Sequence, residues 1–138
     1  GTSLVYGKVP IIPLEYYDIY TTSASTTSTT YQTYHSFATP TLRAKTYKIS
    51  WDFLYNFSSN NANCYARIYL DETTVLWESV LLVSRNIASS RLPIGSCAYV
   101  SFGSAGTHTI SLQYRSDASG KTMYLYGSTI SIAEIRTS

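Results

Sequence analysis

Apolar and polar residues alternate along most of the chain, and the alternation is clearest in residues 44–57, AKTYKISWDFLYNF. Taking every second position gathers the large apolar side chains on one face, which would carry Tyr47, Ile49, Trp51, Phe53, Tyr55 and Phe57. The opposite face would carry Lys48, Ser50, Asp52 and Asn56. Side chains alternate across a β-strand, whereas a helix would scatter these positions around its axis. The run therefore predicts a long strand with one buried face.

Further segments with a period of two follow at roughly even spacing. They span residues 28–38, 63–70, 74–83, 97–102, 107–116 and 122–135. Clusters of turn-forming residues separate them, and the longest connection, residues 84–96, is predicted to be a loop. In the last segment the parity of the apolar positions changes between Leu125 and Ile130. A one-residue bulge near Gly127 would explain that change.

About seven or eight such strands, without helical periodicity, predict an all-β fold, an antiparallel β-sandwich or jelly roll. The composition agrees, because Tyr occurs 14 times and charged residues make up only 13% of the chain, against roughly 25% in average globular proteins. We expect residues 27–138 to form this domain, since a chain of this length can bury a core of its own. Low charge and many tyrosines also favour a surface that contacts other protein chains.

The first 26 residues do not fit the strand pattern and are predicted to form an extended N-terminal arm and hinge. Pro10 and Pro13 exclude a regular central strand in residues 1–20, and residues 21–30, TTSASTTSTT, are almost entirely Ser and Thr. The arm is nonetheless apolar, and its candidate assembly residues are Val9, Ile11, Ile12, Leu14, Tyr16 and Tyr17. Two interpretations remain open: the arm lies across its own domain, or it docks on a neighbouring subunit as an added strand.

Charge, cysteine content and hydropathy argue against several classes of function. The net charge is only +2 and the basic residues are scattered, so we predict no nucleic-acid binding. Cys64 and Cys97 belong to no C-x-x-C unit and only two histidines are present, so no metal site or cofactor is predicted. The two cysteines form either a disulfide or, as we favour, two buried free thiols. No run of 18 apolar residues is present, so no membrane span is expected.

No constellation in the sequence predicts catalysis. A nucleophile requires a nearby base and a third group that orients the base. His35 and His108 both fall in predicted strands, and no G-x-S-x-G motif is present. Asp52 is the most suggestive carboxylate, because it lies mid-strand opposite the aromatic face, but we expect it to be solvated or salt-bridged. No catalytic residue is therefore predicted, and an enzyme is the weakest of the functions considered.

Tyrosines on the predicted outer faces are candidate binding residues. They are Tyr65, Tyr69, Tyr99, Tyr124 and Tyr126. Exposed aromatic rings on a β-sandwich can serve as platforms for sugar rings, and a glycan receptor is one interpretation. We favour packing against neighbouring subunits, because positions along strands form a broad flat surface rather than a groove.

The strand order and spacing resemble a recurrent type of bacteriophage and metagenomic virus protein. The matching positions are Thr39, Pro40, Leu42, Ala44, Tyr47, Ile49 and Trp51 in one segment, Ala66, Arg67, Ile68 and Leu70 in the next, and residues 105–114, AGTHTISLQY, in the third. The resemblance covers about residues 27–135 and leaves the arm outside. It implies a jelly-roll domain of a tail fibre, head fibre or capsid decoration protein, commonly trimeric and shaped like tumour-necrosis-factor-like trimers.

These observations together predict a structural, non-enzymatic subunit at a virion surface or in another extracellular setting. We expect it to assemble through its arm with copies of itself, possible trimers included, and with a capsid, tail or filament protein. A cell-surface filament or pilus subunit joined by donor-strand exchange is one alternative, and a carbohydrate-binding β-sandwich module is another.

Overall fold

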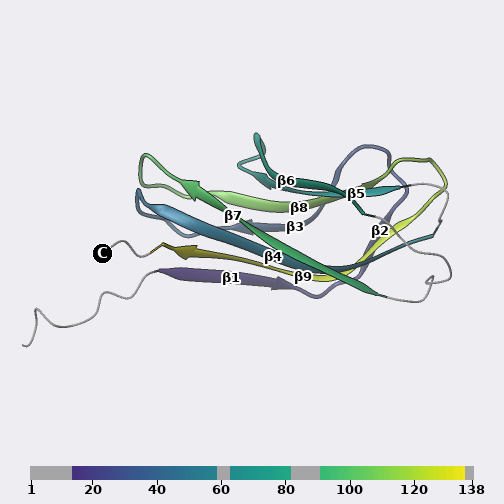
Figure 1. The fold of residues 1–138 in the computed structure, drawn as a ribbon, viewed down its shortest axis with the longest axis horizontal. Coiled ribbons are helices and arrows are strands. Elements are labelled where there is room, and N and C mark those ends of the chain that lie inside the picture. The colour runs from purple at the N-terminus through teal and green to yellow at the C-terminus, as the bar shows by residue number, and fades with distance from the viewer. Residues whose placement is uncertain (1–13, 59–62, 82–90, 136–138) are drawn as a thin grey trace, which may run out of the picture.

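Two antiparallel β-sheets pack face to face in the computed structural model of this chain, which describes residues 14–58, 63–81 and 91–135 (Figure 1). These residues hold no helix that is long and apolar enough to cross a membrane. The strands are β1 (Glu15–Tyr20), β2 (Ala24–Thr26), β3 (Gln32–Ala38), β4 (Thr46–Phe57), β5 (Cys64–Leu70), β6 (Thr74–Leu81), β7 (Leu92–Ser101), β8 (Thr109–Ser116) and β9 (Met123–Glu134).

The order of the strands defines a jelly roll. Sheet A has the order β1-β9-β4-β7, with β2 also paired to β9, and sheet B has the order β3-β8-β5-β6. The pairings are antiparallel throughout. From β3 onward the chain passes to the other sheet at each connection except the β5–β6 hairpin. Connections that alternate between two sheets in this way make the interleaved Greek keys of a jelly roll, so the predicted fold class is confirmed.

The core lies between the sheets, and the period of two builds it. The inner face of β4 carries the aromatic ladder predicted from the sequence, and each of its six large side chains is at most 7% exposed. Opposite it, β8 buries Ile110 and Leu112 completely. Trp51 of sheet A meets Trp77 of sheet B with ring centroids 5.7 Å apart. Full burial of a large apolar side chain contributes about 1.5–3 kcal/mol, so the alternation decides which face of each strand meets the other sheet.

The change of parity in the last strand is a β-bulge at Gly127, as predicted. The register between β4 and β9 shifts between Phe53 and Tyr55, where β9 holds one extra residue. Gly127 has a φ of 123°, a value that residues with a side chain rarely adopt. The bulge lets Leu125 before it and Ile130 after it both face the core, where neither is exposed.

The loop predicted over residues 84–96 is partly a strand. β7 begins at Leu92 and pairs with β4 along its whole length. Pro93 cannot donate a ladder hydrogen bond, but β7 is the edge strand of sheet A, where proline is tolerated. The start of β7 therefore escapes a search for regular alternation, because an edge strand can carry loop-forming residues. The first part of the predicted loop lies outside the described residues.

Part of the segment predicted to be arm and hinge belongs to sheet A. β1 and β2 pair with β9, so the sandwich begins at β1 rather than at residue 27. Leu14 is half-buried, Tyr16 packs against the core and Tyr17 points outward. The candidate assembly residues that lie outside the described part of the chain are Val9, Ile11 and Ile12. Residues 15–26 thus lie across their own domain, and docking on a neighbour stays a prediction for the residues before them.

Both cysteines are free thiols in positions that no disulfide joins. Cys64 on β5 is completely buried, and burial raises the pKa of its thiol to about 12. Cys97 on β7 is exposed, because it pairs with Ser50 on the outer side of sheet A. The disulfide considered from the sequence is therefore wrong, and so is the expectation that both thiols are buried.

Candidate functional site

The outward-pointing residues of sheet A form a surface that we call the A face. The register places them in three rows that cross β1, β9, β4 and β7 in that order. The first row holds Glu15, Ala133, Lys48 and Tyr99, the second holds Tyr17, Ser131, Ser50 and Cys97, and the third holds Ile19, Thr129, Asp52 and Gly95. Directly opposed residues of an antiparallel ladder share one side of the sheet, so each row runs straight across the face.

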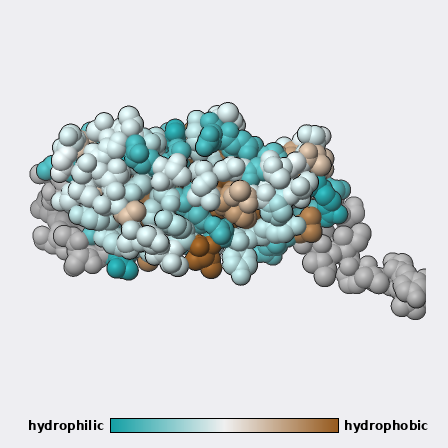
Figure 2. All heavy atoms as spheres, turned by 180° about the vertical axis from the view of Figure 1, so that it is seen from behind, coloured by the Kyte–Doolittle hydropathy of each residue, from teal (hydrophilic) through white to brown (hydrophobic). Residues whose placement is uncertain are grey.

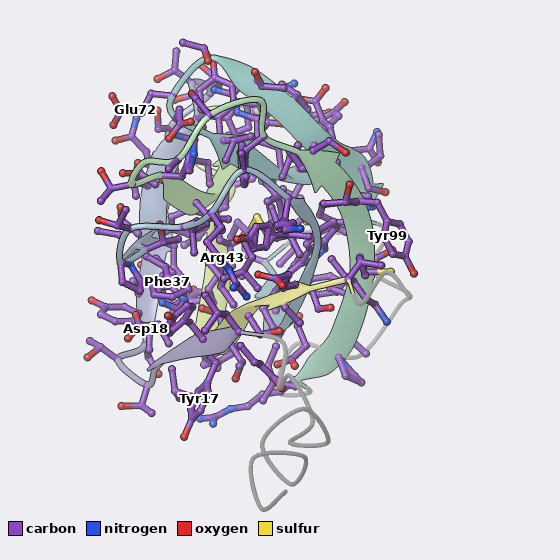
Figure 3. The ribbon with its side chains drawn as sticks, turned by 90° about the vertical axis from the view of Figure 1, so that its left-hand side faces the viewer. Tyr17, Asp18, Phe37, Arg43, Glu72 and Tyr99 are labelled. Carbon is purple, nitrogen blue, oxygen red and sulfur yellow. The ribbon has the colours of Figure 1, made fainter. Side chains whose placement is uncertain are left out.

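Large side chains border the A face, while small ones occupy its middle. Tyr17 and Ile19 on β1 are 66% and 57% exposed, and Tyr99 on β7 is 64% exposed. Figure 3 shows Tyr17 and Tyr99 at opposite edges of the sheet, both pointing away from the core. Between them, β9 and β4 contribute mainly alanine, serine and threonine. Large exposed side chains on the outer side of a sheet favour contact with another protein.

Two opposite charges lie in the middle of the A face. Lys48 and Asp52 are both on β4 and lie on either side of Ser50. Neither takes part in an ion pair with the residues that the structure describes. Four residue-to-residue steps along an extended strand place their Cα atoms about 13 Å apart. The middle of the A face therefore presents one positive and one negative charge, each open to a partner, and Glu15 adds a second negative charge at the β1 edge.

A hollow of about 370 Å³ opens beside Asp52 at one end of the A face. Its apolar lining comes from Ile19, Leu54, Pro93 and Tyr126. Gly95 is the neighbour of Asp52 on β7, and a Cβ there would lie only 2.9 Å from the carbonyl oxygen of Trp51. A carboxylate beside apolar walls is suited to receive an aliphatic chain that ends in a cation.

Two of the predicted surface tyrosines stand beyond the bulge on the outer side of β9. Tyr124 and Tyr126 are half-buried and stack on each other, with ring centroids 6.1 Å apart and planes inclined by 10°. The guanidinium carbon of Arg91 lies 4.4 Å from the ring centroid of Tyr126. Arg91 thus covers a ring face of Tyr126 that a sugar would need for stacking.

Two others lie on the opposite side of the molecule, on the outer face of sheet B. Tyr65 and Tyr69 are half-buried on β5, on either side of Arg67. The guanidinium carbon of Arg115 lies 3.9 Å from the ring centroid of Tyr65. That of Arg67 lies 4.1 Å from the centroid of Tyr69. The predicted surface tyrosines therefore occupy two opposite faces, and arginine side chains cover rings on both.

Tyr31 connects the polar groups on the outer face of sheet B. Its ring lies 4.1 Å from the guanidinium carbon of Arg67, and its hydroxyl donates a 2.6 Å hydrogen bond to Oε2 of Glu78. Desolvation, and then the nearby Glu78 carboxylate, raise the pKa of Tyr31 above the usual value of 10.0. Arg67 also donates from Nε to Oε1 of Gln113 over 2.7 Å. These polar groups are therefore paired with one another on the outer face of sheet B.

His35 is a buried link between the two sheets. Its ring is carried by β3 of sheet B and is 2% exposed. Nε2 lies 2.7 Å from Oδ2 of Asp18 on β1, and Nδ1 lies 2.5 Å from Oγ of Ser128 on β9. With its proton on Nε2, the neutral ring donates to the carboxylate and accepts from the serine hydroxyl. We call these three residues the His35 clasp.

The His35 clasp has the residue types of a Ser-His-Asp triad in an order that does not suit nucleophilic attack. A catalytic serine has to be reachable by its substrate, while the carboxylate stays buried behind the histidine. Here Ser128 is 5% exposed, whereas the side chain of Asp18 is 48% exposed. The exposed end of the chain of hydrogen bonds is thus the carboxylate. The geometry supports a structural link between sheets A and B.

The second histidine is held at the start of β8. His108 stacks on Phe102 with ring centroids 3.8 Å apart, and its Nδ1 lies 2.7 Å from Oδ2 of Asp71. The other carboxylate oxygen of Asp71 accepts from the backbone N–H of Thr109 over 2.8 Å. His108 precedes β8 instead of lying within the predicted strand. In the described part of the chain, no three His, Cys, Asp or Glu residues are grouped to hold a metal ion.

One side of the molecule has a surface of mostly intermediate hydropathy (Figure 2). Figure 2 shows a mainly white and pale teal surface on one side of the molecule, with isolated brown patches. This agrees with a sequence rich in Ser, Thr and Tyr and poor in charge. A weakly charged surface repels other protein less strongly, which favours association.

No protein-family model and no curated protein matches this chain. Among solved structures, the dimeric latent PorU from Porphyromonas gingivalis is similar over 92% of this chain, with a TM-score of 0.59 and 7% sequence identity. Chains of the Gx and Gt strains of infectious bursal disease virus are similar over 88% of it, with TM-scores of 0.58 and 0.55 and 14% identity each.

The chain spans 13% of the PorU chain and 32% and 33% of the viral chains. A domain with a similar fold thus occurs in a bacterial protein and in a virus, in each case as part of a longer polypeptide. Identities this low say nothing about chemistry, and one fold serves many functions. The likeness shows that this chain shares its fold with part of each of these longer chains.

Proposed function

We propose that the chain is a structural, non-enzymatic subunit of a virion surface that assembles with copies of itself. The A face is the observation that carries this proposal. It is broad, it has an exposed aromatic or aliphatic side chain at each edge, and its central charges have no ion-pair partner among the described residues. The likeness to capsid-protein chains of infectious bursal disease virus supports the virion setting.

The N-terminal arm has a second role in the proposal. Residues 1–13 precede β1, which forms the edge of sheet A. An apolar segment that precedes an edge strand in the sequence is well placed to add to a neighbour, and Ile11 and Ile12 are its most apolar pair. Removing only these 13 residues keeps β1 and the His35 clasp intact.

The solution mass of the purified protein tests self-assembly. Sedimentation velocity over a range of concentrations should show the full chain as an oligomer, and the chain without residues 1–13 as a smaller species with unchanged circular dichroism. A full chain that stays monomeric at every concentration would contradict the proposal. A truncated chain that assembles as well as the full chain would remove the role of the arm.

Electron microscopy with a gold-labelled antibody against the domain tests the virion setting. The proposal predicts gold label on the surface of virus particles. Gold label on filaments at the cell surface would instead support the alternative that the protein is a pilus subunit.

The alternative of a carbohydrate-binding module has less support. Arginine guanidinium groups already cover rings of Tyr65, Tyr69 and Tyr126, so a sugar would have to displace them. Tyr99 is the candidate with the most exposed ring. A glycan array probed with the domain tests this alternative. A glycan that binds the unchanged domain but not the Tyr99→Ala variant would favour the carbohydrate-binding module over the structural role.

A further inference from the structure

We propose that the A face binds the A face of a second copy about a two-fold axis that crosses the strands above Ser50. The inference rests on the self-association proposed above and names its surface and register. The two sheets would lie face to face with their strands antiparallel. A two-fold contact of this kind uses one self-complementary patch twice.

The charges on β4 select this register. An axis through the second row exchanges the first and third rows, so Lys48 of each copy lies opposite Asp52 of the other. Two equivalent ion pairs result. An axis along the strands would instead place Lys48 over Lys48 and Asp52 over Asp52, which like-charge repulsion disfavours.

Side-chain size along β7 matches the same register. Tyr99 in the first row is 64% exposed and comes opposite Gly95 in the third row. A Cβ at Gly95 would lie 2.9 Å from the carbonyl oxygen of Trp51, so the backbone holds this position to glycine. The absent side chain leaves room above β7 for the ring of Tyr99. The largest exposed residue of β7 thus meets its smallest.

The hollow beside Asp52 suits the lysine that this register brings to it. Its volume is about 370 Å³, and Leu54 and Pro93 are part of its apolar lining. The methylene groups of Lys48 from the other copy would lie against these walls while its ammonium group meets the carboxylate. A pair enclosed in this way is screened by salt less than an exposed pair.

The dimensions of sheet A are adequate for a stable contact. Its long strands β4, β7 and β9 have 12, 10 and 12 residues. Four strands about 4.8 Å apart, with about 3.3 Å per residue, cover roughly 650 Å² on each copy. Stable protein interfaces bury about 600–1,000 Å² per partner, so a contact at the lower end of that range would use the whole A face.

Exchanging the two charges tests the register. In sedimentation equilibrium, Lys48→Asp and Asp52→Lys are each expected to weaken dimerisation by at least about tenfold, because each places like charges together twice. The double variant K48D/D52K restores both pairs and should dimerise within a few-fold of the unchanged protein. Lys121→Asp, in the exposed turn before β9, makes the same charge change away from the A face and should leave dimerisation unaltered. Circular dichroism of each variant checks folding.

A cross-link through Cys97 gives an independent measurement. Cys97 is in the second row, so the axis brings the two thiols of a dimer face to face. The backbones of packed sheets lie about 10 Å apart, so the two sulfur atoms that face each other would be closer than that and within reach of a short bis-maleimide, which should join them in high yield. Cys97→Ser should abolish the product, since Cys64 is buried.

The outcomes separate this inference from the function on which it rests. Weakening by both single variants, rescue in the double variant and a Cys97 cross-link together support the register. Assembly that none of the charge variants alters overturns the register and leaves self-assembly standing. A chain that is monomeric at every concentration overturns both.

Discussion

Replacing Asp18 with alanine would measure what the His35 clasp contributes to the folded state. The substitution leaves Nε2 of His35 buried without its carboxylate partner, since the ring is 2% exposed. An unpaired buried donor costs about 1–3 kcal/mol. The side chain of Asp18 is 48% exposed, so water can partly replace the carboxylate. We therefore expect the lower part of that range, about 1–2 kcal/mol.

Thermal unfolding converts this cost into a measurable shift. Unfolding entropy of about 2.1 cal/mol/K per residue implies roughly 3–4 °C for each kcal/mol in a chain of this size, so Asp18→Ala should lower Tm by about 3–7 °C. Asp18→Asn keeps an acceptor for Nε2 and should lose less. Glu15→Ala, an exposed position on the same strand, is the matched control; at a concentration low enough for the chain to be monomeric it should cost less than about 0.5 kcal/mol.

Two results would refute this view of the clasp. One is an Asp18→Ala variant no less stable than the Glu15→Ala control. The other is covalent labelling of Ser128 by a fluorophosphonate, because a serine that is 5% exposed should not react in the folded protein. Hydrogen exchange adds a local readout: the amides of β1 should exchange faster in Asp18→Ala than in the control.

Three further predictions follow from the bulge, the thiols and the buried phenols. Gly127→Ala places a side chain on a residue with a φ of 123° and should lower the free energy of unfolding by about 1–3 kcal/mol, measured in urea. Its control is Gly103→Ala, where no atom lies within 4 Å of the added Cβ, and this variant should be neutral. One thiol, Cys97, should react with Ellman's reagent in the folded chain at a concentration low enough for it to be monomeric, and Cys64 only after denaturation. Burial raises the pKa of Cys64 from 9.0 to about 12, and burial with Glu78 raises that of Tyr31 above 10.0. The folded state therefore holds these protons more tightly, so stability should be full below pH 9 and fall as the pH rises from 9 towards 12, measured by urea unfolding.

The strands that could be predicted from the sequence are those whose burial alternates locally. In β4 the residues at every second position, such as Trp51 and Phe53, face the core, so the sequence pattern by itself predicts the strand and its buried face. The bulge at Gly127 was predictable for the same reason, because a change of parity is a local signal. β7 is different: it starts at Leu92 on the edge of the sheet, where half-exposed and exposed positions give no clear contrast.

The His35 clasp could not be predicted, because its members come from three strands. Asp18 lies in the segment predicted as an arm, and its partner His35 lies in the other sheet. Ser128 reaches the ring only because the bulge next to it sets the parity of β9. A histidine in a strand pattern indicates an inward or outward side chain, but the pattern contains no information about which strand faces it.

The A face shows most sharply what a pattern of residues omits. Alternation correctly places Asp52 and Tyr99 on outer faces, yet it cannot tell that one row of sheet A joins Tyr99 to Lys48 and another joins Gly95 to Asp52. The sequence pattern predicts Gly95 to be a loop residue, whereas in the structure it lies on β7 beside Asp52. In the proposed dimer its missing side chain leaves room for Tyr99 of the other copy. The same fold occurs in a bacterial protein and in a virus, so the fold alone does not determine what covers such a face. Exchanging the charges of Lys48 and Asp52 tests directly whether a second copy covers the A face, because only that partner places each residue opposite the other.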